Sequence, residues 1–261
     1  MNRTIVVLVL AICLNCRLGS ALERNSRRLL CDNFLGLFCG NSKCPPEGFD
    51  SVKDFDVRKY ISAPWYIQEQ MTNSYQRKNS LFCVRAKYEL VDDGDITKGL
   101  RVFNYANIDK VNGEPMGAAS TDDDQSFTEL RALLPDESVP SKLKVGPKFL
   151  VDTLGQTVAE TLFGNYWVVA VGESEDEELG YDWAIVSGGP PKVETDDGCR
   201  TGREFFNGVQ VNGVGLWLFS RKEVDPEGTK VMREKARELG FDLSVLLPVE
   251  QKGCKYEGAR Q

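Results

Sequence analysis

The stretch from residue 82 to residue 95 reads FCVRAKYELVDDGD. Within it, four apolar side chains alternate with three charged ones: Val84, Ala86, Tyr88 and Leu90 against Arg85, Lys87 and Glu89. This period of two is typical of a half-buried strand. The acidic, glycine-containing end of the stretch predicts a hairpin turn into a second strand at residues 100–108.

Similar short β-prone runs, separated by turn residues, lie on both sides of this hairpin. The runs are 65–70, 82–91, 100–108, the weaker 111–120, 127–134, 142–150, 166–171, 181–187 and 214–221. About eight strands at regular spacing over roughly 160 residues predict an antiparallel barrel or sandwich.

One helix is predicted after the last strand. Asp225 is a capping residue, Pro226 suits the first turn, and Gly240 suits the end. The apolar side chains on one side of this helix are Val231, Met232, Ala236 and Leu239. We expect the helix to pack on the outside of the β-structure. The chain shows no internal repeat and no domain linker.

The first 21 residues have the layout of a secretory signal peptide. A short basic start precedes the apolar run 5–14, and small residues follow at 19–21. The run is too short to span a bilayer, and we expect no transmembrane segment in the mature chain. Residues 22–54 are then a cysteine-containing N-terminal extension, and residues 55–256 form the main domain.

Composition excludes several classes of function. The net charge of -7 argues against a nucleic-acid partner, which needs a basic face. The chain has no histidine, so neither a Ser-His-Asp nor a Cys-His catalytic arrangement is available. Six cysteines remain after the signal peptide, without the paired spacing of a zinc site, and they predict disulfides. We therefore expect no catalytic residues, no metal and no cofactor.

Three segments resemble the three sequence motifs of the lipocalin family, in order. Residues 43–46 (KCPP) with 55–66 (FDVRKYISAPWY) resemble the first motif, residues 181–186 (YDWAIV) part of the second, and residues 216–221 (LWLFSR) the third. The chain departs from the family at 62–64, where Ser-Ala-Pro replaces the usual glycine, and at 173–178, an acidic run. The resemblance covers about residues 43–255 and is greatest to apolipoprotein D-like and plant plastid lipocalins.

This resemblance implies an all-β fold, an eight-stranded antiparallel up-and-down barrel with a C-terminal α-helix packed outside. In that family a short turn of 3₁₀ helix leads into the first strand. The resemblance also implies that Arg221 stacks across Trp65 at the closed end of the barrel, a structural role that a guanidinium over an indole face serves well.

The same resemblance implies a disulfide pattern. Carried over by position, Cys44 pairs with Cys199 and Cys83 with Cys254. Cys31 and Cys39 are then left for each other.

A lipocalin barrel binds or sequesters a small hydrophobic ligand, such as a lipid, retinoid, sterol or carotenoid. Alternation predicts that Tyr88 and the other apolar side chains of its strand face inward. For the strand at 166–171, alternation allows either face to point inward, and the resemblance favours the face that carries Trp167. The expected ligand-binding residues are Tyr88, Val102, Asn104, Trp167 and Val169. A barrel filled by these side chains, acting through its surface, is the other interpretation.

A lipocalin-fold enzyme acting on a lipophilic substrate such as a xanthophyll is the alternative function. One enzyme of that fold needs a free thiol on a barrel strand, for which Cys83 is the only candidate. We expect no enzyme, and a secreted or extracellular location. A plastid lumen reached through a two-part targeting signal is the alternative location, and the oligomeric state is left open.

Overall fold

The computed structural model describes residues 43–117, 129–202, 204–206, 209–211 and 214–260. The predicted signal peptide, most of the predicted N-terminal extension, and both Cys31 and Cys39 lie outside these residues. None of the helices in the described ranges has the length and apolar composition needed to cross a membrane.

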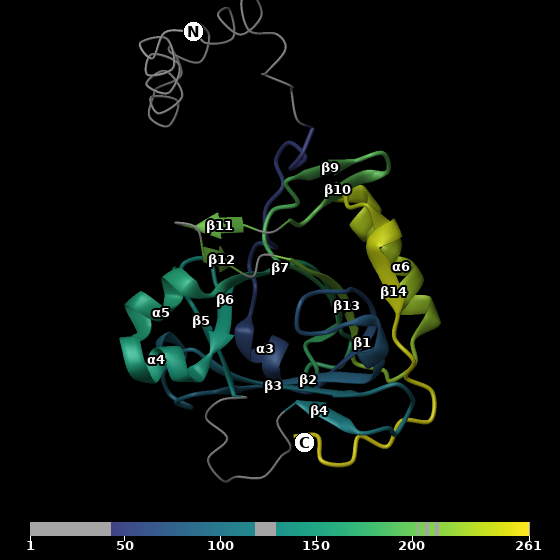
Figure 1. The fold of residues 1–261 in the computed structure, drawn as a ribbon, viewed down its shortest axis with the longest axis horizontal. Coiled ribbons are helices and arrows are strands. Elements are labelled where there is room, and N and C mark those ends of the chain that lie inside the picture. The colour runs from purple at the N-terminus through teal and green to yellow at the C-terminus, as the bar shows by residue number, and fades with distance from the viewer. Residues whose placement is uncertain (1–42, 118–128, 203, 207–208, 212–213, 261) are drawn as a thin grey trace, which may run out of the picture. The chain divides into compact units, whose positions relative to one another are not determined.

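In the described part of the chain, eight antiparallel strands follow one another around a closed barrel (Figure 1). They are β1 (Trp65–Met71), β2 (Phe82–Leu90), β3 (Leu100–Asn107), β5 (Leu130–Leu133), β6 (Lys142–Pro147), β7 (Gly164–Glu173), β8 (Tyr181–Ser187) and β13 (Leu216–Ser220). Pairing of β13 with β1 closes the barrel. The predicted up-and-down barrel is therefore confirmed, and the alternative of a sandwich is excluded.

Several short elements lie outside this circuit. The short helix α3 (Val57–Ile61) leads into β1 at the place that the resemblance implies, but it is an α-helix rather than a turn of 3₁₀ helix. Within the described residues of the weak run at 111–120, which end at Gly117, the one strand is β4 (Pro115–Gly117), which pairs with β3 and is not a barrel strand. The remaining elements are β9 (Val193–Thr195), β10 (Gly198–Arg200), β11 (Glu204–Phe206), β12 (Val209–Val211) and β14 (Leu246–Pro248), with short 3₁₀ turns at Lys78–Ser80, Ile96–Lys98 and Leu243–Val245.

The prediction of a strand over residues 142–150 is wrong for residues 148–150. The strand stops at Pro147, and two helices follow, α4 (Lys148–Leu154) and α5 (Gln156–Leu162). Proline fixes φ near the helical value and has no N–H for a sheet, so it suits the start of a helix. The helices pack on the barrel through Ala159, which lies with Leu133 and Phe163 in one apolar cluster.

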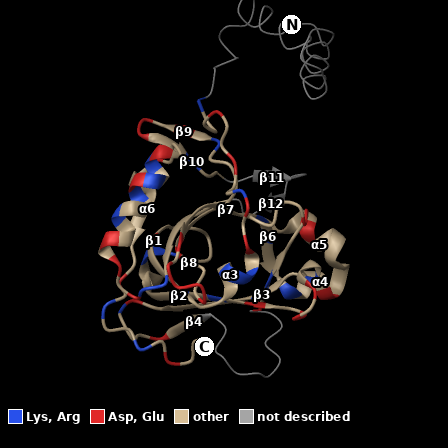
Figure 2. Cartoon of the chain, turned by 180° about the vertical axis from the view of Figure 1, so that it is seen from behind, with Lys and Arg blue, Asp and Glu red and all other residues tan. Residues whose placement is uncertain are grey.

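The predicted C-terminal helix is confirmed as α6 (Pro226–Glu238), which lies along the outside of the barrel (Figure 1). Met232 and Ala236 are buried against strands β8 and β13. Val231, expected on the same side, is instead 47% exposed, because one step of 100° along the helix turns it away from the barrel. Basic and acidic residues alternate along the outer surface of α6 (Figure 2).

Two disulfides form as the resemblance implies. Cys44 is bonded to Cys199, and Cys83 to Cys254. The first attaches the segment before the barrel to strand β10, and the second attaches β2 to the C-terminal segment.

Candidate ligand-binding cavity

The barrel encloses a cavity of about 420 Å³. Apolar side chains from six of the barrel strands make up most of its wall. They are Ile67, Val84, Ala86, Val102, Ala106, Leu130, Val145, Trp217 and Phe219. None of the described residues that line it is Asp, Glu, Lys or Arg, and its polar groups are phenols and amides. A mostly apolar pocket with a few placed polar groups is the usual form of a small-molecule site.

Three of the five predicted ligand-binding residues line this cavity. Tyr88, Val102 and Asn104 lie in its wall, on strands β2 and β3. The alternation that placed Tyr88 inward holds along β2, since Val84 and Ala86 line the cavity with it.

The other two predicted residues, Trp167 and Val169, do not line the cavity. Both lie in the apolar layer between the barrel wall and α6. The inward orientation predicted for Trp167 is wrong, and its neighbour Tyr166 lines the cavity instead. A β-bulge follows at Val169, where the pairing of β7 with β8 skips one residue. The bulge gives Val169 and Ala170 the same outward side and returns Val171 to the interior.

A second bulge decides which β1 residues face the cavity. The pairing of β1 with β13 skips Gln68, so Ile67 and Gln70 both line the cavity. Strict alternation from Trp65 would have placed Glu69 inside. Glu69 instead faces α6, where the guanidinium of Arg233 lies 2.5 Å from its carboxylate. No glycine or other local signal in the sequence marks this bulge, and Gln70 was missed for that reason.

Three tyrosines form a hydrogen-bonded cluster at one end of the cavity. The hydroxyl of Tyr166 lies 2.6 Å from that of Tyr60 and 2.7 Å from that of Tyr88. Tyr88 and Tyr166 line the cavity, whereas Tyr60 lies on α3, behind them. Burial raises the pKa of all three phenols above the ordinary value, so the cluster is neutral at physiological pH.

Below this tyrosine cluster, Trp65 and Arg221 close the barrel. The guanidinium of Arg221 lies 3.4 Å from the centre of a Trp65 ring that is fully buried. The indole N–H of Trp65 donates to the carbonyl of Tyr60 at 2.9 Å. The stacking implied by the resemblance is therefore present. The stacked pair contacts the tyrosine cluster through Tyr60, at the closed end of the barrel.

Cys83 is not available as a reactive thiol. It is fully buried, bonded to Cys254, and packed against Tyr105 and Tyr256 outside the barrel interior. Cys83 was the only candidate for a free thiol on a barrel strand. Because it is in a disulfide, the thiol that such an enzyme needs is absent at that position.

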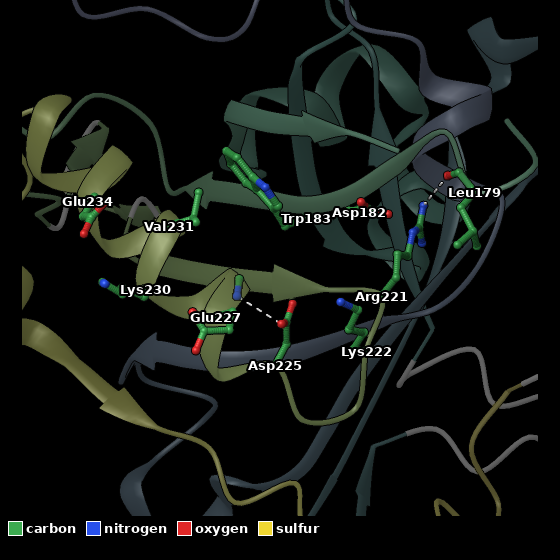
Figure 3. A pocket seen from close by; sticks show the side chains of 11 residues that line it. Leu179, Asp182, Trp183, Arg221, Lys222, Asp225, Glu227, Lys230, Val231 and Glu234 are labelled. Carbon is green, nitrogen blue, oxygen red and sulfur yellow. Dashed lines mark hydrogen bonds between the residues drawn. The ribbon is translucent and has the colours of Figure 1, made fainter. Parts of the chain in front are cut away.

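A second pocket, of about 450 Å³, lies outside the barrel between α6 and the strands β8 and β13 (Figure 3). Trp183 and Val231 lie beside it, but its other lining residues are mainly charged: Asp182, Arg221, Lys222, Asp225, Glu227, Lys230 and Glu234. Its volume is similar to that of the interior cavity. The interior cavity is the better candidate for an apolar ligand, because none of the described residues in its wall is charged.

No protein-family model matches the chain, and no curated protein matches it in sequence. Among solved structures, it is similar to lobster apocrustacyanin A1, with 14% identity, a TM-score of 0.45, and coverage of 78% of this chain and 84% of that one. It is also similar to insecticyanin from the tobacco hornworm, Manduca sexta, with 13% identity, a TM-score of 0.43, and coverage of 84% of this chain and 90% of that one. The similarity to the allergen Per a 4 from cockroaches has 14% identity, a TM-score of 0.42, and coverage of 76% of this chain and 90% of that one. These similarities are weak, and the fold assignment rests on the strand order of the barrel itself.

Proposed function

We propose that this chain is a lipocalin that binds and carries or sequesters a small hydrophobic molecule inside its barrel. The observation that carries this proposal is the mainly apolar cavity of about 420 Å³, whose described lining residues carry no charge. Pockets of roughly 300–1,000 Å³ enclose ligands of the size of a retinoid or a sterol. The Arg221–Trp65 stack and the helix outside the barrel add support for the family.

Tryptophan fluorescence tests this proposal, because the four tryptophans occupy different places. Trp217 lines the cavity, Trp65 lies under its floor, and Trp167 and Trp183 lie outside the barrel. The oxidised protein is titrated with retinol, cholesterol, palmitate and β-carotene. We expect at least one of them to change the fluorescence in a saturable way.

The matched variants locate the binding. Trp217→Phe should remove most of the ligand-dependent signal, whereas Trp167→Phe and Trp183→Phe should retain it. A signal that depends on Trp183 but not on Trp217 would place the ligand in the outer pocket. Absence of binding by folded protein for every probe would instead favour a filled barrel that acts through its surface.

We propose a binding protein rather than an enzyme, since the thiol of Cys83 is bonded to Cys254. We also propose export of the mature chain into an oxidising compartment. Two disulfides that join distant parts of the chain support this, because such bonds persist in secreted proteins. N-terminal sequencing of the exported protein checks it, with a start after residue 21 as the expected result.

A further inference from the structure

The barrel wall is discontinuous where β1 meets β2. These strands pair directly at Trp65 and Tyr66 of β1, whereas β2 and β3 pair along almost their whole lengths. Further along the same edge, the partner of Glu69–Met71 is β14 instead of β2. We call the boundary between residues 67–71 of β1 and residues 82–84 of β2 the seam.

The C-terminal segment 246–251 fills the seam. Its strand β14 pairs antiparallel with β1, and the N–H of Val249 donates to the carbonyl of Gln68 at 2.9 Å. On the other side, the N–H of Cys83 in β2 donates to the carbonyl of Glu250 at 2.9 Å. The segment therefore acts as a short extra strand between β1 and β2.

Gln251 closes the seam beside the cavity. Its amide Nε2 donates to the carbonyl of Ile67 on β1 at 2.8 Å and to that of Val84 on β2 at 2.7 Å. Ile67 and Val84 both line the cavity, so this buried side chain spans the wall directly outside it. One amide thus takes the place of direct bonds between the two strands.

The disulfide between Cys83 and Cys254 fastens the C-terminal segment to β2. Cys83 has a φ of 52°, in the left-handed region that residues other than glycine rarely adopt, and it lies where the pairing of β2 with β3 shifts register. Such a conformation is unfavourable and persists only while its surroundings hold it. The edge of the seam on β2 is therefore held in place by this bond.

The two disulfides differ in their access to solvent. Cys44 and Cys199 are both buried, with exposures of 8% and 4%. In the other bond Cys83 is buried, but Cys254 is partly exposed and is followed by the exposed Lys255. A positive side chain favours the approach of a thiolate, which is the species that attacks a disulfide. A dithiol should therefore reduce the bond between Cys83 and Cys254 first.

We infer that reduction of this bond by a dithiol opens the seam, so that ligand enters and leaves the cavity through the side of the barrel. One thiolate of the dithiol attacks Sγ of Cys254 and displaces the thiolate of Cys83, which takes up a proton. The second thiolate then displaces Cys254, which is protonated in turn, and the dithiol leaves as a disulfide. The protein gains two electrons and two protons, and the dithiol loses them. The inference rests on the proposed function, because it adds a route to the same cavity.

Contacts beyond Cys254 do not depend on the bond. The ring of Tyr256 lies 5.2 Å from that of Tyr66, and the guanidinium of Arg260 donates to the carboxylate of Glu89 at 2.9 Å. The reduced protein should therefore remain folded, with the C-terminal segment opening more often rather than detaching permanently.

Hydrogen exchange measures the opening without a ligand. In Cys83→Ser/Cys254→Ser, the amides of Val249, Glu250 and residue 83 should exchange about tenfold faster than in the wild-type protein. The amides of the β1–β13 pairing should keep their protection, which also shows that the variant is folded. The matched control is Cys44→Ser/Cys199→Ser, which removes a bond of similar span away from the seam and should leave the seam amides unchanged.

Release of retinol measures the route. Loaded protein is mixed with excess phosphatidylcholine vesicles, and the loss of energy transfer from tryptophan to retinol gives the rate. Release should be about tenfold faster in Cys83→Ser/Cys254→Ser, and equally in wild-type protein in which mass spectrometry shows only this bond reduced. Cys44→Ser/Cys199→Ser should release retinol at the wild-type rate.

A second pair of variants leaves both disulfides intact. Gln251→Met removes the amide that spans the seam and should give a smaller increase in the release rate, because two carbonyls lose their donor. Gln156→Met, on the exposed surface of α5, is its control and should give none.

The inference is overturned if the seam amides stay as protected as in the wild-type protein, or if retinol release accelerates equally in the two double-serine variants. If retinol alone fails to bind, the probe that does bind takes its place, with release followed by tryptophan fluorescence. If none of the four probes binds the wild-type protein, the proposed function fails, and the inference fails with it.

Discussion

Arg221 joins segments that are far apart in the sequence. Besides stacking on Trp65, its guanidinium donates to the carbonyls of Tyr60 at 3.0 Å and of Tyr181 at 3.1 Å. Burial lowers the pKa of Arg221 to about 10, which still leaves it charged at neutral pH. Several carbonyls at the closed end of the barrel therefore depend on this one cation.

Arg221→Met should lower the free energy of unfolding by about 3 kcal/mol, because buried carbonyls lose their donors. Arg221→Lys should lie between that variant and the wild type, since an ammonium cannot reproduce the planar fork. Urea unfolding followed by circular dichroism measures both. Arg237→Met, on the exposed side of α6, is the matched control and should stay within about 0.5 kcal/mol of the wild type. An equal loss in the two methionine variants would show that Arg221 has no special role.

At the scale of single elements, the two bulges determine the cavity wall. The bulge at Gln68 in β1 places Gln70 inside, and the bulge at Val169 in β7 places Ala170 outside and Val171 inside. Each shifts the alternation by one residue, which moves every following side chain to the other face. Strict alternation therefore holds on β2 from Val84 to Tyr88 and fails beyond each of these two bulges. Trp167 precedes the bulge in β7, and it was misplaced because the resemblance favoured the face of that strand that points outward.

The start of α6 is a second feature at the scale of single elements. The carboxylate of Asp225 accepts from the backbone N–H of Gly228 at 3.0 Å (Figure 3). It also accepts from the hydroxyl of Ser220 at 2.6 Å, so it joins the helix to β13.

Asp225→Ala should lower the free energy of unfolding by about 1–2 kcal/mol, the typical effect of a lost helix cap. Asp225→Asn retains an acceptor for Gly228 and should lose less. Thermal and urea unfolding measure the difference, with the exposed Glu234→Ala on the same helix as control. A wild-type stability for Asp225→Ala would mean that packing alone fixes the start of the helix.

At the scale of the whole molecule, strand closure and the two disulfides hold distant parts of the chain together. Cys44 and Cys199 are 155 residues apart, and Cys83 and Cys254 are 171 apart. A cross-link over so long a loop restricts the unfolded chain strongly, with typical stabilisation of about 2–4 kcal/mol.

Replacement of either pair by serine should therefore lower the free energy of unfolding by about 2–5 kcal/mol. The midpoint of urea unfolding, compared with and without a reductant, provides the measurement. Wild-type protein should become less stable in the reductant, and each double-serine variant should lose only the contribution of its remaining bond. A wild-type midpoint that does not respond to the reductant would contradict this expectation.

The sequence by itself determined the order of the strands, the cap and end of α6, and, through its motifs, the Arg221–Trp65 stack and both described disulfides. The strands and the helix depend on local alternation and on capping residues, whereas the stack and the disulfide pairing were implied by the resemblance to the lipocalin family. Tyr88, Val102 and Asn104 could be placed in the cavity because their strands have no bulge between them and the residues that set the alternation.

Only the tertiary structure decided the remainder of the wall. The bulges in β1 and β7 are visible only in the pairing with the neighbouring strands, and the residue types at Gln68 and Val169 do not predict them. The helices that follow Pro147 were likewise absent from the prediction, since their apolar residues gain stability only by packing on β5 and β6. The cluster of Tyr60, Tyr88 and Tyr166 brings together three elements, and closure of the barrel alone makes them neighbours.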